Sequence, residues 1–377
     1  MKKIALNYIY LSKKHAGGKD QVGLNLLKGF QENGCSKDMY LICYDYSVEI
    51  LKRISPDIHI LSIPAPNQTS ELRRMLGNML TNTFIIPKFL KKEGINLIFH
   101  LDCNNGFFKF KAKSIVIPHD IKAISHRDLP GLHIPFYKYC MYKIMYAMDF
   151  KHADMIIGIS DVDKREIQEY YPKYKKKVIR IYDPIDIEPC KEIVRERESN
   201  IVAINLQFHH KNIITLIKAF ELIKDEIQEN LLLVGNVPDR VLYLKEYVKE
   251  HNMEDRIRFT GFVSDEERNQ LLLNCKLYVA PTLFEGFGMV PVEAIISGVP
   301  TLVSKIPTNY EVTQGLCNYY EPAEDELSLA KEILVCLNRQ LDYDDMINAS
   351  KILFEMYNYK RISMEYMTLF CKVDKNG

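Results

Sequence analysis

Short apolar runs alternate with helical patterns along the whole chain, and this rhythm constrains the fold more than any other feature. In the first half, the runs typical of buried strands lie at 4–10, 39–43, 58–63, 97–101, 114–117 and 155–159. Helical patterns separate them; Val22, Leu26 and Phe30, for example, share one helix face, and Gly34 ends that pattern. Alternation of this kind predicts a parallel, doubly wound sheet.

The same rhythm restarts near residue 200. Apolar runs and helical patterns alternate again at 201–205, 212–224, 231–234, 241–250 and 257–259. Between the halves, Pro184 fixes its own φ and biases Asp183 toward extended backbone, as a short crossing between domains requires. We therefore expect an α/β chain of two Rossmann-like domains, 1–185 and 186–356, facing a cleft that holds the ligands.

Composition excludes several classes of protein. The 377 residues carry 50 Lys+Arg and 49 Asp+Glu, a net charge of +1 that gives no electrostatic reason to expect nucleic acid as a partner. The nine cysteines include no C-x-x-C pair, so we expect neither a zinc site nor disulfides, and a reducing cytoplasm fits best. No run approaches 18 apolar residues, so we expect no transmembrane helix.

The segment 278–304 carries the clearest chemical signal. It reads as a strand, a loop with Gly286 and Gly288, a helix with Pro291 in its first turn, and a stop at Gly298. A helix that begins after glycines presents N–H groups and the positive end of its dipole to an anion. We therefore expect a phosphate group of a ligand at this helix start.

Two carboxylates flank that helix start. Glu285 precedes the helix and Glu293 lies near its first turn, so they should address different parts of one elongated ligand. Carboxylates beside a phosphate site are acceptors suited to sugar hydroxyls. The alternative is structural: Glu293 would only complement the helix dipole, and Glu285 would be a solvated loop residue.

On these residues the chain resembles retaining GT-B glycosyltransferases, especially glycosyltransferase family 4, whose signature is E-x7-E. The resemblance covers nearly the whole chain, and its blocks occur in the family's order: Gly17-Gly18, IPHD (117–120), HADMIIGISDVDKREI (152–167), VIRIYDPID (178–186), HKNIITLIKAF (210–220), TGFVSDEERNQLL (260–272) and the E-x7-E block. It implies a GT-B fold with an acceptor-binding first domain and a nucleotide-sugar-binding second domain. It also implies that 357–377 forms a helix that packs back on the first domain.

The resemblance assigns roles to residues of the second domain. Glu285 would contact the hydroxyls of the donor sugar, Glu293 would hold the ribose, and Lys211 would neutralise the departing diphosphate. Lys211 is otherwise a solvated lysine at a helix start. The donor-binding residues implied in this domain are Asn205, Gly261, Phe262, Val263, Gly286, Phe287, Gly288, Met289, Val290 and Glu293. Ser264 and Glu267 also form a capping box, which alone would explain them.

In the first domain the resemblance points to three residues. His119 matches a histidine near the transferred sugar, although a lone histidine is more often structural. Gly17 and Gly18 would bring backbone N–H groups to the diphosphate, although a strand-to-helix turn needs glycine too.

The chain departs from the family pattern at one position. Many relatives carry an arginine five or six residues before the lysine, where this chain has Asn205 and Leu206. His209, His210 and Lys305 are candidates to compensate for the missing guanidinium.

The sequence predicts no metal ion and no other cofactor in the site. Asp161-Val162-Asp163 has the form of a metal-binding D-x-D, but it follows Ser160 directly after a strand. A helix N-cap with acidic residues in the first turn accounts for this pattern.

Residues 137–150 are rich in Tyr and Met, which favours a buried helix. The alternative is an amphipathic face that touches a membrane or a lipid-linked acceptor. With 88–93 and 172–177 it would form a basic face on the first domain, at the inner side of the plasma membrane.

Together these features indicate a cytoplasmic retaining glycosyltransferase that moves a hexosyl group from a nucleotide-diphosphate sugar to a hydroxyl of a glycan or lipid-linked saccharide, in bacterial surface polysaccharide synthesis. Rival hypotheses are a sugar-nucleotide epimerase or phosphorylase on the same fold, and a catalytically weak or inactive binding subunit. A nicotinamide dehydrogenase is disfavoured because the first βα turn has no G-x-G-x-x-G.

Overall fold

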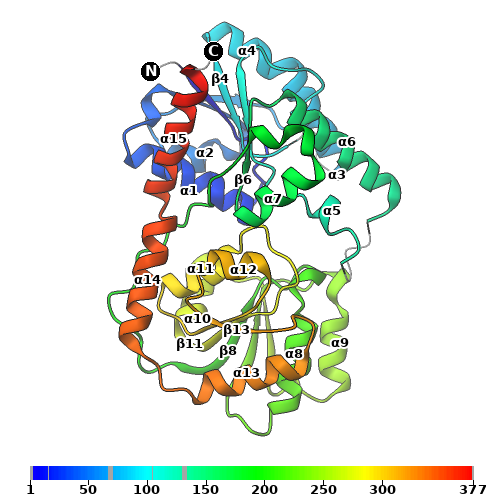
Figure 1. Cartoon of the computed structure of the whole chain (residues 1–377), viewed down its shortest axis with the longest axis vertical. Coiled ribbons are helices and arrows are strands. Elements are labelled where there is room, and N and C mark those ends of the chain that lie inside the picture. Colours follow the sequence, from blue (N-terminus) through cyan, green and yellow to red (C-terminus); the bar gives the residue numbers. More distant parts are fainter. Residues whose placement is uncertain (1–2, 16, 67–70, 104, 130–133, 376–377) are drawn as a thin grey trace. The chain divides into compact units, whose positions relative to one another are not determined.

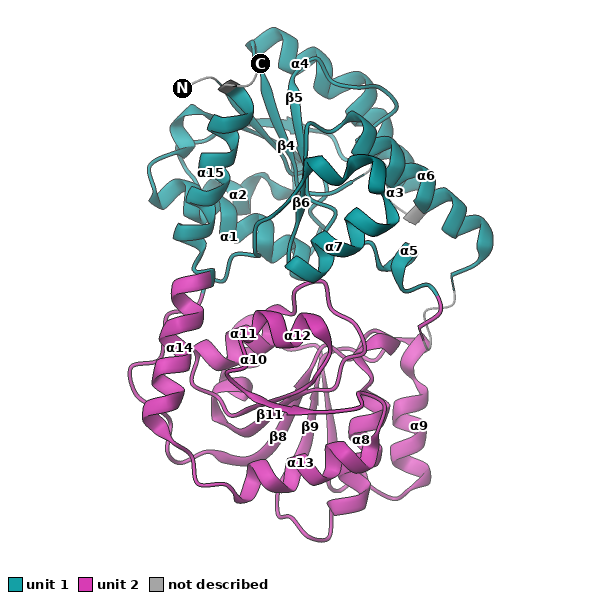
Figure 2. Cartoon of the chain, viewed as in Figure 1, with its two compact units in different colours: residues 1–127, 134–186, 357–377 teal, residues 128–133, 187–356 magenta. Residues whose placement is uncertain are grey.

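The computed structural model describes residues 3–15, 17–66, 71–103, 105–129 and 134–375. Helices and strands alternate along most of the chain (Figure 1). The chain divides into two compact units, 1–127 with 134–186 and 357–377, and 128–133 with 187–356 (Figure 2). The first is called unit 1 and the second unit 2.

Unit 1 is built on a seven-stranded parallel sheet of order β3-β2-β1-β4-β5-β6-β7. Its strands are β1 (Ile4–Asn7), β2 (Met39–Tyr44), β3 (His59–Ile63), β4 (Leu97–His100), β5 (Lys113–Val116), β6 (Met155–Gly158) and β7 (Val178–Arg180). Its helices are α1 (Gly18–Glu32), α2 (Val48–Ile54), α3 (Glu71–Leu80), α4 (Ile86–Glu93), α5 (Lys122–Ser125), α6 (Phe136–His152), α7 (Asp161–Tyr170) and α15 (Tyr359–Lys375), with short turns η1 (Ser36–Asp38), η2 (Asp45–Ser47), η3 (Thr81–Ile85) and η4 (Pro172–Lys177).

Unit 2 has a six-stranded parallel sheet of order β10-β9-β8-β11-β12-β13. Its strands are β8 (Glu198–Ile204), β9 (Asn230–Val234), β10 (Ile257–Gly261), β11 (Cys275–Ala280), β12 (Thr301–Ser304) and β13 (Asn318–Tyr320). Its helices are α8 (Ile213–Ile223), α9 (Tyr243–Glu250), α10 (Asp265–Asn274), α11 (Met289–Ile296), α12 (Pro307–Val312), α13 (Glu326–Asn338) and α14 (Tyr343–Tyr357), with turns η5 (His209–Lys211) and η6 (Asp239–Val241). Both sheets confirm the predicted fold class of two doubly wound α/β units.

Strand β8 shows why the sheet of unit 2 is buried on both faces. Ile201 and Ala203 pack with side chains of α8, α9 and α13, whereas the alternating residues Val202 and Ile204 pack with side chains of α10 and α11. Side chains of a strand point to opposite faces in turn, so a strand covered on both sides reads as a continuous apolar run. This is the pattern that the sequence carries at 201–205.

The C-terminal helix α15 belongs to unit 1, where it lies against α1. A Cβ added at Gly29 of α1 would lie 2.5 Å from the Tyr359 carbonyl oxygen and 2.6 Å from Ser363 Oγ, so the absence of a side chain permits this close approach. Asn33 Nδ2 donates to Ser363 Oγ at 2.8 Å and to the Lys360 carbonyl oxygen at 2.8 Å. Packing and hydrogen bonds therefore hold the last helix of the described chain on α1.

Local signals in the sequence account for several helix ends. Ser160 caps α7 by accepting from the Asp163 N–H, and Ser264 caps α10 by accepting from the Glu267 N–H, which confirms both predicted caps. Gly298 follows α11 with a φ of 70°, a left-handed conformation that favours glycine. The edge strands β7 and β13 have three residues each, and no prediction placed strands there.

The prediction of a buried helix over 137–150 is wrong. Helix α6 forms there, but its buried described side chains are those of Asp149 and Phe150. Phe136, Tyr137 and Ile144 are 73%, 68% and 67% exposed. The helix joins the core through its C-terminal end, where Phe150 packs in the same cluster as residues of β5, β6 and α7, and composition alone does not reveal how far a helix extends beyond its sheet.

Candidate functional site

In unit 2 the strand order reverses between β8 and β11, which lie side by side. Open parallel sheets bind ligands outside the carboxyl ends of their strands at such a switch point. The chain after β11 is tied to the chain after β8, because the Leu283 N–H donates to the His210 carbonyl oxygen at 2.8 Å and Thr282 Oγ1 donates to the same oxygen at 3.0 Å. These bonds fix the two loops in one place.

Lys211 and Glu285 meet at this point, 74 residues apart in sequence. Lys211 Nζ donates to Glu285 Oε1 at 2.5 Å, and the two side chains are 19% and 14% exposed. A partly buried pair of this kind offers a cation and a two-oxygen acceptor side by side. A ligand that carries both an anionic group and hydroxyls can therefore engage both residues.

The start of α11 adjoins Glu285. Gly288 is the N-cap residue with a φ of 86°, and it has no side chain to offer to the first turn. A Cβ at Gly288 would lie 3.5 Å from Asn309 Oδ1 and 3.6 Å from Glu285 Cγ. Asn309 is held by its amide, which donates to the Ser304 carbonyl oxygen at 2.9 Å, and its buried Oδ1 has no hydrogen-bond partner among the described residues. The loop before α11 thus has the backbone geometry expected of an anion site.

Glu293 lies on α11 and is ion-paired with Arg268 of α10. The side chains are 12% and 21% exposed, and the Glu293 carboxylate outweighs the effect of burial, so the pKa of Arg268 is raised. The sequence analysis did not single out Arg268. Its place in the TGFVSDEERNQLL block is the one feature of the sequence that points to it. Its partner Glu293 lies 25 residues away, and the packing of α10 near α11 brings the two side chains together.

The resemblance implies that Glu293 holds the ribose of a nucleotide-sugar donor, so replacing Arg268 by glutamine is expected to weaken donor binding, because Glu293 would lose the guanidinium that orients it. We expect KM for the donor to rise about tenfold while kcat changes less than about threefold, the pattern of lost uniform binding. Steady-state kinetics and donor titration by calorimetry measure the two effects. The conservative Arg268→Lys should recover part of the affinity. An equal fall in kcat and kcat/KM for Arg268→Gln would instead show that Arg268 acts only in the transition state.

The remaining predicted residues of unit 2 occupy different environments. Gly261 ends β10 with a φ of 72°, and the next residue, Phe262, is 73% exposed. Asn205, directly after β8, is exposed with a φ of 72°. Val263 is partly exposed and packs against the core cluster beside α10, whereas Phe287 is only 2% exposed. Met289 and Val290 form the partly exposed first turn of α11.

The candidates for replacing the missing arginine have other partners. The His209 ring stacks on Tyr243 with the planes 3° apart, and Lys305 Nζ pairs with Glu321 Oε1 at 2.8 Å. His210 contributes its carbonyl oxygen to the loop contacts described above.

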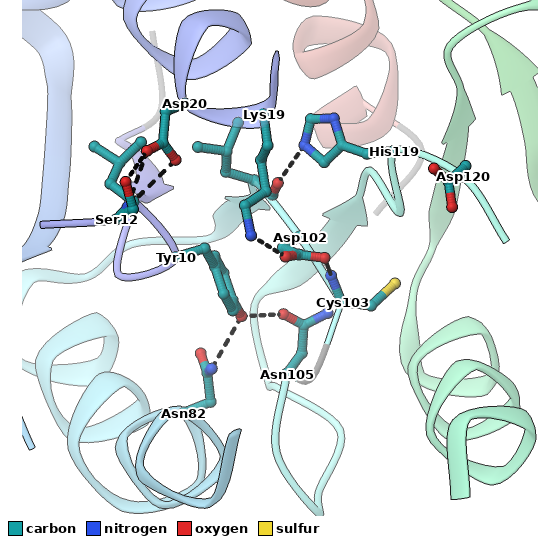
Figure 3. A network of polar contacts seen from close by, with 12 residues as sticks. Tyr10, Ser12, Lys19, Asp20, Asn82, Asp102, Cys103, Asn105, His119 and Asp120 are labelled. Atoms are coloured by element: carbon teal, nitrogen blue, oxygen red, sulfur yellow. Dashed lines mark hydrogen bonds and ion pairs between the residues drawn. The ribbon is translucent and has the colours of Figure 1, made fainter. Parts of the chain in front are cut away.

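Unit 1 also carries a polar site at its switch point, which lies between β1 and β4. Lys19 at the start of α1 pairs with Asp102 after β4, with 2.6 Å between Nζ and Oδ2 and side-chain exposures of 33% and 28% (Figure 3). The other carboxylate oxygen of Asp102 accepts from the Cys103 N–H at 2.7 Å. The sequence analysis did not single out either residue, because 83 residues separate them.

His119 lies in the same network (Figure 3). Its backbone is left-handed, with a φ of 64°, and its Nε2 lies 2.7 Å from the Leu101 carbonyl oxygen. Burial lowers the pKa of His119, and a carbonyl oxygen can only accept, so the neutral ring carries its proton on Nε2. Nδ1 is then left with a lone pair that can accept a hydrogen bond from a hydroxyl.

The two glycines of unit 1 play different parts. Gly17 is the N-cap of α1 with a φ of 109°, whereas Gly18 is the first residue of the helix. In the network of Figure 3, Tyr10 Oη donates to Asn105 Oδ1 at 2.6 Å and accepts from Asn82 Nδ2 at 3.0 Å.

The D-x-D pattern at 161–163 is part of the start of α7. The Asp163 carboxylate accepts from the Ile159 N–H at 3.0 Å, and Asp161 lies 3.7 Å from the Arg180 guanidinium. Within the described residues, no group of three or more His, Cys, Asp or Glu side chains is arranged to hold a metal ion. Nor does any described helix combine the length and apolar character needed to cross a bilayer.

Comparison with solved structures agrees with the fold of the chain. The chain aligns over its full length with a sucrose-phosphate synthase from Thermosynechococcus elongatus, with a TM-score of 0.79 and 17% identity, and both chains are covered completely. It aligns over 99% of its length with all of Anabaena HepE in complex with UDP-glucose, with a TM-score of 0.72 and 15% identity. These likenesses establish the GT-B fold.

Residues 186–352 match the family model of glycosyl transferases group 1. The O-antigen chain mannosyltransferase RfbU of Salmonella typhimurium is 26% identical over 208 residues, which cover 55% of this chain and 56% of that protein. The alignment thus spans about half the length of this relative. The match to the family model places residues 186–352 in the glycosyl transferases group 1 family, as the E-x7-E resemblance predicted.

Proposed function

We propose that the chain transfers a hexosyl group from a nucleotide-diphosphate sugar to a hydroxyl acceptor, with retention of the anomeric configuration. The observation that carries this proposal is the Lys211–Glu285 pair at the switch point of unit 2, next to the start of α11. A diphosphate sugar has the two features that this pair recognises, an anion for the lysine and hydroxyls for the carboxylate.

In the proposed reaction, donor binding exchanges the contact between Lys211 and Glu285 for contacts with the ligand. The sugar hydroxyls donate to Glu285, and a diphosphate oxygen accepts from Lys211. The bond between C1 and the diphosphate oxygen then breaks, the acceptor oxygen bonds to C1 on the same face, and the acceptor proton ends on the diphosphate. Negative charge grows on the leaving group, so Lys211 and the N–H groups of 286–289 stabilise the transition state more than the ground state.

We assign the hydroxyl acceptor to unit 1, with His119 and Asp102 as its contacts. Nδ1 of neutral His119 and the Asp102 carboxylate are both acceptors, which suits a hydroxyl donor. A mannosyl donor is the first choice because the Salmonella relative is named an O-antigen mannosyltransferase, and this name also supports a role in surface polysaccharide synthesis. The nine free cysteines fit a reducing cytoplasm.

Product analysis tests the proposal. The chain is incubated with nucleotide-diphosphate mannose, glucose, galactose or N-acetylglucosamine, with and without saccharide acceptors, and the products are identified by mass spectrometry and by NMR of the anomeric proton. A new glycoside that forms only with acceptor and keeps the donor's anomeric configuration supports transfer. Conversion of the donor without acceptor would indicate an epimerase, and donor binding without any product would indicate a binding subunit.

Transfer is expected to need no divalent cation, because Lys211 and the start of α11 supply the charge that a metal would otherwise bring to the diphosphate. Activity after extensive EDTA treatment should stay within about twofold of the untreated rate. A loss that Mn²⁺ or Mg²⁺ restores would show that a metal takes part.

A further inference from the structure

Unit 1 exposes apolar side chains on α3, on η3 and on the loop after β4. We define the α3 face as Leu76, Leu80, Phe84, Ile85, Phe107 and Phe108, which are 48%, 52%, 55%, 45%, 47% and 69% exposed. Leu76, Leu80 and Phe84 recur every four residues and so lie along one side of the helix. The opposite side faces inward, since Asn78 and Asn82 are buried and Asn78 accepts from Tyr44 Oη at 2.8 Å.

The loop contributes to the same surface because it is fastened to η3. The Phe107 N–H donates to Thr83 Oγ1 at 3.1 Å, and a Cβ added at Gly106 would lie 2.8 Å from that oxygen. Phe110, three residues later, is buried against His100. Phe107 and Phe108 are therefore held outward by a well-anchored loop.

Cations surround the α3 face. Residues 71–93 contain five Lys or Arg and two Glu, and residues 107–113 contain three Lys and no acidic residue. Lys88, Lys109 and Lys111 are exposed, and Lys109 Nζ lies 3.8 Å from the Asp154 carboxylate, which Lys113 also approaches. Apolar side chains fringed by lysines match the two layers of an anionic bilayer surface, acyl chains and lipid phosphates.

We propose that the α3 face docks unit 1 on an anionic membrane, with the apolar side chains at the acyl boundary and the lysines at the phosphates. A second copy of the chain is a poorer occupant, because an isologous contact would bring the like charges of two basic rims together. A membrane-facing α6 is the alternative that the sequence offers to a buried helix; among the described residues, the α3 face carries six exposed large apolar side chains and α6 carries three. The proposal stands whether or not the chain transfers a sugar.

Vesicle sedimentation tests the proposal without donor or acceptor. The full chain is mixed with vesicles of phosphatidylcholine alone or with about one third phosphatidylglycerol, at about 50 and 500 mM salt. We expect sedimentation only with the anionic vesicles, and at least about tenfold weaker binding at the higher salt, where surface charges are screened. The triple variant Leu80→Asp, Phe84→Asp, Phe108→Asp should lose at least about tenfold in binding.

Matched controls separate this face from other exposed apolar residues. Leu222→Asp with Leu327→Asp changes residues of unit 2 that are 51% and 66% exposed, and it should bind as the parent does. Phe136→Asp with Ile144→Asp on α6 should lose less than about threefold. Circular dichroism checks that each variant is folded. Parental binding by the triple variant, a dominant loss in the α6 variant, no binding to anionic vesicles, or a concentration-dependent dimer that the triple variant abolishes would each overturn the proposal.

Discussion

Replacing either Glu285 or Lys211 by alanine is expected to lower sugar transfer at least about tenfold, a loss of roughly 1.4 kcal/mol of transition-state stabilisation. Each side chain is less than one-fifth exposed and is the other's partner at 2.5 Å, so a single replacement leaves a partly buried charge without its counter-ion. Lys211→Ala should act mainly on kcat, because leaving-group charge grows during the reaction, whereas Glu285→Ala should also raise KM for the donor.

The double variant makes this prediction more specific. Lys211 and Glu285 interact directly with each other, so the loss of activity in the double variant should be smaller than the product of the two single losses. Lys276→Ala is the matched control, since Lys276 pairs with Glu229 at 2.6 Å in the same unit, on β11. Rates near the parental value in both single variants, or an equal loss in the control, would contradict the assigned roles.

The two units repeat one arrangement that neither sequence segment reveals alone. In each sheet a lysine from the chain after the first strand meets a carboxylate from the chain after the neighbouring strand, Lys19 with Asp102 at 2.6 Å and Lys211 with Glu285 at 2.5 Å. The common cause is the reversal of strand order, which brings the loops of two sequence-distant strands together. The Lys19–Asp102 pair therefore holds the same position in unit 1 as the Lys211–Glu285 pair holds in unit 2.

Features set by neighbouring residues could be predicted from the sequence. The apolar run at 201–205 predicts a buried strand, and both faces of that strand are buried in the structure. Gly288 predicts a turn, and its backbone is left-handed in the structure. The caps at Ser160 and Ser264 follow from the residues three positions later. In each case the physical cause lies within a few residues, so the local pattern carries it.

Features that depend on tertiary packing could not be predicted in the same way. Arg268 is one charged residue among several on α10, and only its position opposite Glu293 distinguishes it. Helix α6 failed as a core prediction because tyrosine and methionine occur both in cores and on exposed apolar faces, and the extent of the sheet decides between the two. The roles of Glu285, Glu293, Lys211 and His119 toward a ligand remain predictions for the kinetic experiments.

Asp183→Asn is expected to stabilise unit 1 increasingly as the pH rises. Asp183 is 4% exposed, burial raises its pKa to about 8, and its Oδ1 has no hydrogen-bond partner among the described residues. The ionisable groups that it influences are Tyr366 of α15 and Asp163 of α7, and neither supplies a positive charge.

An unfolded chain would release the Asp183 proton near pH 3.9, so the folded state binds more protons between about pH 4 and 8. The free energy of unfolding therefore falls as the pH rises through this window, by up to about 5 kcal/mol, whereas an amide at this position does not ionise. Urea unfolding at pH 4 and pH 8.5 measures the effect: parent and variant should be similar at pH 4, and the variant should be more stable at pH 8.5. Asp57→Asn, on the surface of the same unit, controls for the general effect of removing a carboxylate. A difference between parent and Asp183→Asn that stays constant across this range would show that Asp183 is ionised in the folded protein throughout.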